Sequence, residues 1–377
     1  MSMKVSYKKQ FVVLFFLFIL FLSVIEGVAR IYESNSNSYN CVFLNKDAFE
    51  GISNSFLNSL CYDYKTILLD DDPYHHNVPD QKLNTININS HGFRGEEISK
   101  TKSVDVFRIF MIGGSTVFGY GSTSDNTTIP SNLEDLLNTH FAGEKIEVIN
   151  AGVVGGYSYS EVRLIKNKIY DFDPDMIIVY DGWNDSLNNR IIPDDNSDDN
   201  SDESQNSDES QNSDEPFEFL KLKNYPFYRT PFVLYRLLNP DVAFGPIYPS
   251  SEVNRIQNLW KDRWSEICQI NNEKNISTIV FVHPMSYSGT KPLTSDELNS
   301  ISSETRKTNI INVMDGLVST FPKLDESCSL THDLRGIFNS NSEPVFYDDG
   351  HMTDHGNQIV AEEIFALILP KINLDEK

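Results

Sequence analysis

Four short polar motifs in this 377-residue chain hold the chemical groups that acyl transfer requires. They are GGS ending at Ser115, NAG ending at Gly152, GWND containing Asn184, and DDGH, in which Asp348 precedes His351 by three residues. A serine hydroxyl becomes a nucleophile when a base takes its proton, and imidazole is such a base near neutral pH. A carboxylate fixes the tautomer of that imidazole, while backbone N–H groups and an amide stabilise the oxyanion. The motifs therefore predict a serine-dependent acyl-transfer site.

The GGS motif has two other interpretations, and both fail on spacing. A phosphate-binding loop of the P-loop type needs a lysine after its last glycine, and none follows Gly119. A nucleophile elbow needs a second glycine two residues after the serine, where this chain has Val117. Alone, the motif could also be a structural turn, so its function depends on the other three motifs.

The first three motifs follow short apolar runs at residues 106–112, 145–150 and 176–180, and a fourth run spans 277–282. Such runs, rich in branched side chains, are typical of strands buried on both faces of a parallel sheet. Helical periods of apolar residues cover 133–141, 162–169, 253–267 and 359–368. This alternation predicts an α/β fold with helices on both faces of the sheet and a site at the carboxyl ends of its strands.

The ordered motifs resemble those of the SGNH/GDSL hydrolases, over about residues 90–369 without an acidic insert. The resemblance includes NSHGFRGEE at residues 89–97, a lead-in seen in membrane-anchored members. It implies a three-layer α/β/α sandwich with a flavodoxin-like parallel sheet and no cofactor or metal. Ser115 would be the nucleophile and an oxyanion donor, Gly152 and Asn184 the other donors, and His351 with Asp348 the base pair.

Several neighbouring residues bear on this assignment. Gly114 stands where the family's name motif has aspartate, and two small residues here would let the backbone approach a substrate carbonyl. Asp349 could replace Asp348 as the partner of the histidine, although the family spacing favours Asp348. We expect His355 to be partly exposed on a helix and His283 to pack beside the site.

The N-terminus predicts an exported protein. Three lysines precede an uncharged apolar run at residues 11–25, and Glu26 interrupts it before the run continues toward residue 30. The run is shorter than the roughly 20 residues that span a bilayer comfortably. An uncleaved signal anchor at residues 1–30 is favoured, with a cleaved signal peptide and a buried core helix as alternatives. The lysines would keep the N-terminus in the cytoplasm, so the rest of the chain would lie outside the cell membrane or be secreted.

The remaining chain is expected to comprise an extension at 31–104 and a hydrolase domain at 105–377. Residues 193–216 interrupt that domain with ten acidic side chains and no apolar residue, which predicts a disordered insert. The formal net charge of −23 argues against a nucleic-acid partner.

The chain has four cysteines, and the absence of a CxxC pair argues against a zinc site. The four cysteines are either paired in two disulfides or unpaired and buried.

These features favour an esterase that cleaves a carboxylic ester or O-acetyl group of a small-molecule, lipid or glycan substrate outside the cell. An O-acyltransferase would use the same residues and replace water by a sugar hydroxyl. A non-catalytic surface or assembly protein could also be built on this fold, because a fold alone does not guarantee activity.

Overall fold

The computed structural model describes residues 6–37, 47–71, 74–187, 230, 247–301 and 303–372. Its contacts divide the chain into two compact units, Met1–Cys41 with Asp199–Pro246, and Val42–Asp198 with Ile247–Lys377. The second unit contains every predicted site residue. It begins upstream of residue 105, the expected boundary, so the lead-in belongs to the same unit as the sheet. The predicted insert at 193–216 lies outside the described residues.

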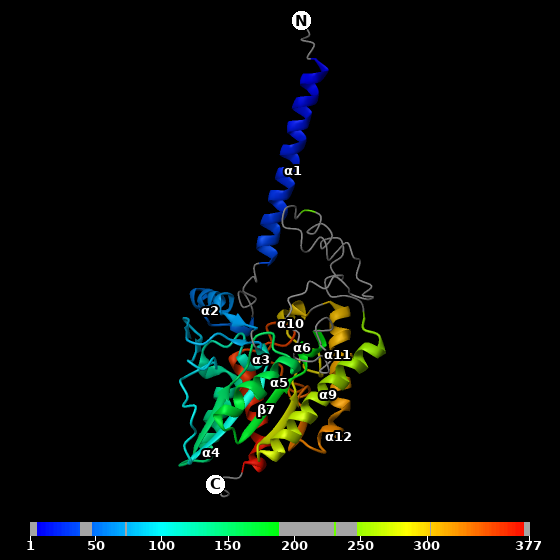
Figure 1. Cartoon of the computed structure of the whole chain (residues 1–377). Helices are drawn as coiled ribbons and strands as arrows, with labels where there is room; N and C mark the ends of the chain where they lie inside the picture. The colour runs from blue at the N-terminus through cyan, green and yellow to red at the C-terminus, as the bar shows by residue number, and fades with distance from the viewer. Residues whose placement is uncertain are drawn as a thin grey trace. The chain divides into compact units, whose positions relative to one another are not determined.

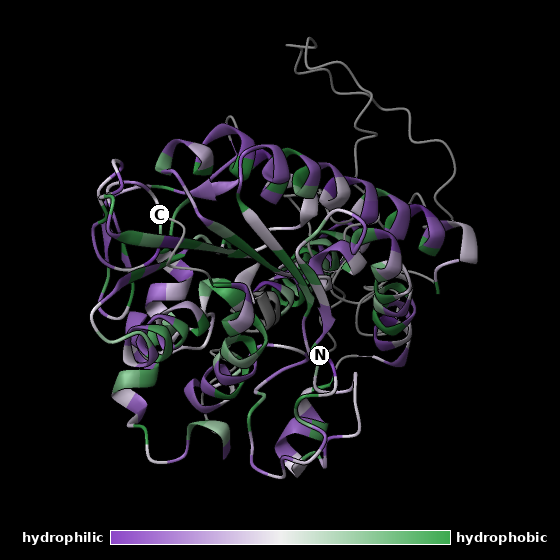
Figure 2. Ribbon diagram, turned by 90° about the horizontal axis from the view of Figure 1, so that it is seen from below, coloured by the Kyte–Doolittle hydropathy of each residue, from purple (hydrophilic) through white to green (hydrophobic). Residues whose placement is uncertain are grey.

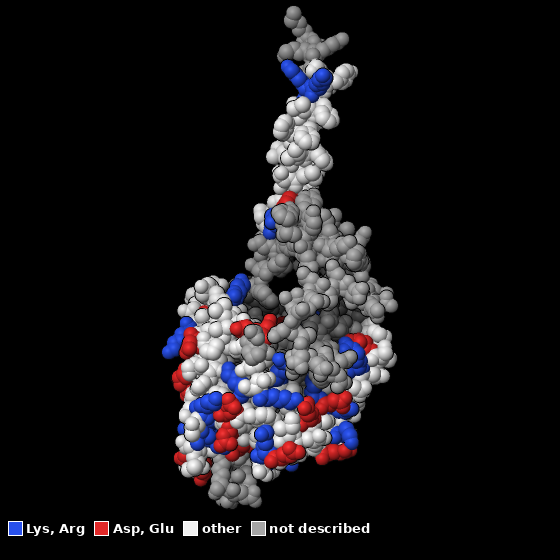
Figure 3. All heavy atoms as spheres, in the orientation of Figure 1, with Lys and Arg blue, Asp and Glu red and all other residues white. Residues whose placement is uncertain are grey.

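The first unit contains helix α1 (Tyr7–Asn37). Its segment Tyr7–Ile31 is long and apolar enough to cross a membrane, and Figure 3 shows an uncharged stretch of the helix surface between charged side chains. Glu26, which interrupts the apolar run, accepts a hydrogen bond from Arg30 at 2.8 Å and two from Thr230 at 3.0 Å. The helix therefore fits the predicted anchor, and a signal sequence has the same properties.

The second unit is built on a parallel sheet in the order β6-β5-β7-β8-β9. Its strands are β5 (Val106–Gly113), β6 (Lys145–Asn150), β7 (Met176–Asp181), β8 (Ser277–Val282) and β9 (Leu330–Asp333). Every residue of β5 and β7 is buried, as expected for strands covered on both faces. The four predicted strands are confirmed, whereas β9 was not predicted.

Helices cover both faces of this sheet (Figure 1), and Figure 2 shows the hydrophobic strands between them. One core cluster joins the sheet to α5 (Ser158–Asn167), α9 (Ser250–Glu273) and α11 (Glu304–Ser319). The other joins it to α4 (Ile129–His140) and α13 (Asp354–Ile368). The second unit is thus a three-layer α/β/α sandwich, which confirms the predicted fold class.

Shorter elements connect these layers. The lead-in contains η1 (Asp47–Phe49), α2 (Asn54–Thr66) and the antiparallel pairs β1 (Leu69–Asp70) with β2 (His76–Asn77) and β3 (Gln81–Lys82) with β4 (Asn87–Ile88). The others are α3 (Ser115–Phe118), η2 (Asp125–Thr127), η3 (Ile169–Phe172), α6 (Trp183–Leu187), α10 (Ser295–Ser300), α12 (Phe321–Leu324) and η5 (Leu369–Lys371). A few short strands were expected in the lead-in, whereas α2 was not predicted.

A disulfide links Cys268 of α9 to Cys328, just before β9, with the two Cα atoms 4.9 Å apart. Cys61 of α2 is also disulfide-bonded, and Cys41 lies outside the described residues. Of the two alternatives left open by the sequence, the structure therefore supports disulfide pairing for the described cysteines.

Candidate active site

Ser115 is the first residue of α3, the single helical turn that follows β5. The turn closes tightly, because the Ser115 carbonyl accepts hydrogen bonds from the N–H groups of Gly119 at 3.0 Å and Tyr120 at 2.8 Å. Ser115 therefore lies at the carboxyl ends of the sheet strands, the edge at which the sequence predicted a site.

His351 joins Ser115 to Asp348 through two hydrogen bonds. Its Nε2 lies 2.7 Å from the Ser115 Oγ, and its Nδ1 lies 2.7 Å from Oδ2 of Asp348. A proton on Nδ1 that is donated to the carboxylate leaves Nε2 to accept the serine proton. The structure thus brings together three residues that lie up to 236 positions apart in the sequence.

Asp348 is held in its ionised form. Burial opposes its charge, but His351 and the backbone N–H groups of Gly350 and His351 outweigh that effect and keep the pKa of Asp348 below its usual value. Those N–H groups donate to Oδ1 at 3.0 and 2.8 Å. A buried carboxylate that receives this many donors keeps a fixed orientation toward the imidazole.

Asp349 and His355, the alternatives to Asp348 and His351, have other partners. Asp349 forms an ion pair with Arg306 at 3.5 Å, so Asp348 and not Asp349 contacts the imidazole of His351. His355 is about half exposed and pairs with Glu343, as its predicted place on a helix surface implied.

A cavity of about 360 Å³ opens beside the Ser115 hydroxyl. Its described lining residues come from six loops and helices around the carboxyl edge of the sheet: Ser115, Gly155, Trp183, Asn184, Leu187, Ser300, Arg306, Asp348, Asp349 and His351. Asn184 of α6 donates from Nδ2 to the carbonyl of Gly156 at 2.6 Å, which fixes its amide beside Ser115. The amide therefore lies next to the serine turn and lines the same cavity as the Ser115 hydroxyl.

The prediction for Gly152 requires correction. Its N–H donates to Oδ1 of Asn150 at 3.0 Å, and a Cβ on Gly152 would lie 2.1 Å from the backbone nitrogen of Phe118. Gly152 thus packs against the back of α3, and it does not line the cavity. Gly155, three residues later, does line it and has a positive φ of 80°. The glycine pair that ends AGVVGG, Gly155 and Gly156, was the signal in the sequence that could have identified it.

Asp185 connects α6 to the segment that follows the Gly155 loop. Its carboxylate accepts hydrogen bonds from the backbone N–H and the hydroxyl of Ser158, the first residue of α5. Burial raises the pKa of Asp185, and hydrogen bonds from Ser158 partly offset that effect. Because Ser158 follows the Gly155 loop and Asp185 follows Asn184, this contact fixes the loop relative to α6.

His283 lies beneath the site and contacts the backbone of α6. Its Nε2 accepts a hydrogen bond from the Trp183 N–H at 3.3 Å, while Nδ1 lies 3.0 Å from the carbonyl of Pro284. Burial lowers the pKa of His283 to about 4, so the ring is neutral at neutral pH. His283 therefore packs beside the site, as expected, and it also accepts a hydrogen bond from α6, which was not expected from the sequence.

The lowered pKa of His283 predicts a pH dependence of stability. Between about pH 6.5 and 4 the unfolded chain binds a proton at this histidine and the folded chain does not, so the free energy of unfolding falls as pH decreases. The slope from this group approaches about 1.4 kcal/mol per pH unit. Urea denaturation of the full-length chain and of His283→Gln across this range should give a smaller slope for the variant, whereas parallel curves would contradict the prediction.

The structure gives a steric reason for the presence of glycine at position 114. A Cβ on Gly114 would lie 2.4 Å from Nδ2 of Asn184 and 3.0 Å from the carbonyl of Gly156. The small residue therefore lets the Asn184 amide approach the serine turn, rather than only giving a substrate carbonyl access to the backbone.

We predict that Gly114→Ala displaces the Asn184 amide and lowers kcat by up to about 10²- to 10³-fold, the cost of losing one oxyanion donor. Ester hydrolysis under saturating substrate measures this effect. Gly336→Ala, in a turn where the added Cβ meets only the flexible Asn339 side chain at 3.2 Å, is the control. Equal kcat for both variants would exclude the steric explanation.

Comparisons with known proteins show which family and which solved structures this chain is similar to. A family model described as GDSL-like Lipase/Acylhydrolase matches residues 109–364, and no curated protein matches the chain. An α/β hydrolase enzyme from the metagenome of Lake Arreo, Spain, is 13% identical with a TM-score of 0.41, over 69% of this chain and 94% of that chain. An acetyl xylan esterase is 14% identical with a TM-score of 0.40, over 70% and 100%. A catalytic mutant of an acetylxylan esterase from Geobacillus stearothermophilus is 14% identical with a TM-score of 0.41, over 70% and 94%.

Proposed function

Since the chain belongs to the GDSL-like lipase/acylhydrolase family and is a serine esterase, we propose that it cleaves ester bonds through an acyl-enzyme on Ser115. The observation that carries this proposal is the continuous hydrogen-bonded path from Ser115 through His351 to Asp348, with 2.7 Å at each step. In that path the nucleophile lies within hydrogen-bonding distance of the base, and the base lies within hydrogen-bonding distance of the group that orients it.

In the first half of the proposed reaction, Nε2 of His351 takes the Ser115 proton as Oγ attacks the ester carbonyl. The negative charge that develops on the carbonyl oxygen is stabilised by the Asn184 amide and by the N–H groups of Ser115 and Gly155. Collapse of the tetrahedral intermediate breaks the ester bond, and His351 gives its proton to the departing alcohol. The acyl group then remains on Ser115.

In the second half, His351 takes a proton from water, and the resulting hydroxide attacks the acyl carbonyl. The intermediate collapses to release the carboxylic acid, and the proton returns from His351 to Ser115. Asp348 stays ionised throughout and stabilises the imidazolium formed in each half.

The cavity favours a short acyl group on a polar alcohol. Its volume of about 360 Å³ is modest, and among its described lining residues only Trp183 and Leu187 are large apolar side chains. A long acyl chain would require an extended apolar surface to leave water. We therefore propose an O-acetyl or similarly short ester of a polar molecule, such as a glycan, as the substrate class.

Hydrolysis of nitrophenyl acetate, butyrate and octanoate by the full-length chain in detergent tests this function. We expect kcat/KM to be highest for acetate and to fall with acyl length, and a serine-directed phosphonate to abolish the activity. Hydrolysis that increases toward octanoate would overturn the short-acyl proposal, and resistance to the phosphonate would overturn the serine mechanism.

We propose further that the second unit works outside the cell, anchored by α1. The apolar segment Tyr7–Ile31 and the lysines that precede its uncharged run at residues 11–25 support an anchor, and disulfides are formed mainly in oxidising compartments. Protease added to intact cells should cut the chain between residues 193 and 216, while protection in intact cells would contradict this location.

A further inference from the structure

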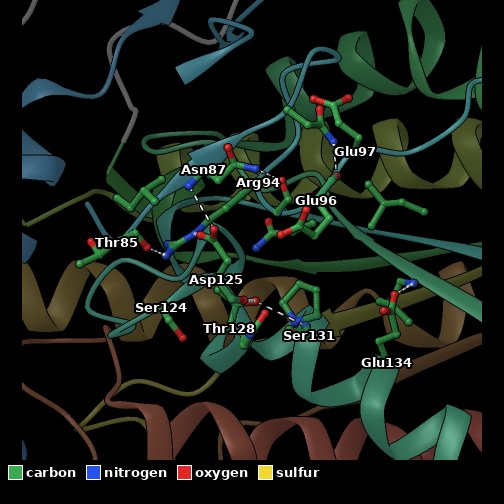
Figure 4. Close-up of a pocket in the computed structure, with 18 of the residues that line it drawn as sticks. Thr85, Asn87, Arg94, Glu96, Glu97, Ser124, Asp125, Thr128, Ser131 and Glu134 are labelled. Atoms are coloured by element: carbon green, nitrogen blue, oxygen red, sulfur yellow. Dashed lines mark hydrogen bonds and ion pairs between the residues drawn. The ribbon is translucent and has the colours of Figure 1, made fainter. Parts of the chain in front are cut away.

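Arg94 lies in the lead-in, upstream of the residues matched by the family model, yet its guanidinium reaches the serine turn. Nη1 donates hydrogen bonds to the carbonyls of Phe118 and Gly119, both at 3.0 Å. Its side chain is almost completely buried. Figure 4 shows Arg94 in the wall of a cavity of about 670 Å³, with its guanidinium directed toward Asp125 and Thr85.

The carbonyls that Arg94 contacts belong to Phe118, the last residue of α3, and to Gly119, its C-cap. The carbonyls at a helix end lack partners within the helix and need donors from elsewhere. Tyr64 supplies a second donor, its hydroxyl bonding the Gly119 carbonyl at 2.5 Å, and the Asn150 amide bonds the Phe118 carbonyl at 3.3 Å. Because α3 has only four residues, a displacement of its end also moves Ser115 at its beginning.

Arg94 is itself fixed by several groups. Its Nε donates to Oδ1 of Asp125 at 2.7 Å, and Oδ2 of the same carboxylate accepts the N–H of Asn87 at 3.1 Å. The guanidinium also lies 5.0 Å from the centre of the Phe118 ring. A planar guanidinium can bind a carboxylate and two carbonyls at once, whereas the single ammonium of lysine cannot reproduce that geometry.

We propose that Arg94 is a positioning residue for Ser115, so that the lead-in is required for the esterase reaction although it lies outside the matched family domain. Arg94 does not reach the cavity beside Ser115, and it acts by holding the end of α3. This inference rests on the proposed function of Ser115 as the nucleophile.

The test compares Arg94→Met and Arg94→Lys with a matched control, Arg108→Met, in the full-length chain. Arg108 is equally buried, pairs with Glu147 and donates to the Phe172 carbonyl at 2.8 Å, but it lies near the opposite end of β5. Active sites are counted by exhaustive phosphonate labelling, and kcat and KM for nitrophenyl acetate are measured per active site.

We expect kcat to fall by up to about 10²-fold in Arg94→Met with KM within about twofold, because a small displacement of a reacting group has this cost. Arg94→Lys should recover only part of the loss. Arg108→Met should unfold at a lower temperature and keep the wild-type kcat per active site, which separates positioning from a general loss of stability.

If Arg94→Met does not fold, Tyr64→Phe decides the question, since it removes the other donor to Gly119 with little change in shape. Wild-type kcat in the folded variants, with Ser115→Ala inactive, would overturn the role of Arg94 and leave the proposed function intact. A wild-type chain that neither hydrolyses the ester nor reacts with the phosphonate would overturn the proposed function, and the inference with it.

Discussion

Ser115→Ala is expected to lower kcat for ester hydrolysis by at least about 10⁴-fold, because it removes the nucleophile from a set of residues that act as one unit. The His351 imidazole would keep its bond to Asp348 but would have no proton to take from residue 115. The fold should be unchanged, since the hydroxyl contributes a single hydrogen bond among those described for the site. Steady-state hydrolysis of nitrophenyl acetate measures the loss.

Ser131→Ala, on the surface of α4, serves as the control for this substitution and should keep wild-type kcat. Activity retained by Ser115→Ala would show that another group is the nucleophile.

The second large effect is expected from Asp348→Asn, which should lower kcat by roughly 10⁴-fold, the loss measured for the equivalent change in a serine protease. The asparagine amide would donate toward Nδ1 of His351 and favour the tautomer that carries its proton on Nε2. That tautomer cannot accept the Ser115 proton, although the positions of the side chains stay the same. The measurement is kcat at neutral pH.

The adjacent Asp349→Asn is the matched comparison, because it makes the same chemical change one residue away. Asp349 faces Arg306 and not His351, so we expect a much smaller loss of kcat in this variant. Equal losses in the two variants would contradict the assignment of Asp348 as the partner of His351.

The parts of the site that could be predicted from sequence are those fixed by local patterns. Apolar runs identified four strands, and parallel pairing brings their carboxyl ends to one edge, where Ser115 and Asn184 lie. The fifth strand, LTHD at Leu330–Asp333, is short and has a single apolar residue, so its pattern does not differ from that of a loop. Its place is determined by pairing with β8, a contact distant in sequence.

Contacts between residues distant in the sequence account for the other differences between the predicted site and the site in the structure. Gly152 and Gly155 share one motif, and only the path of the backbone around α3 decides which of them faces the cavity. Arg94 contacts the end of α3 and His283 contacts the backbone of α6, both from segments whose sequences carry no catalytic signature. No local pattern encodes such contacts, because they form only after the lead-in and the sheet have packed together.

The central claim, an acyl-enzyme on Ser115, is tested most directly by trapping that species. The full-length chain is mixed with nitrophenyl acetate, quenched in acid within the first turnover, digested and analysed by mass spectrometry. We predict one acetyl group on the peptide that contains Ser115, assigned to its hydroxyl by fragmentation and absent in Ser115→Ala. Turnover of the ester without acetyl on Ser115, or with acetyl on a different residue, would contradict the account.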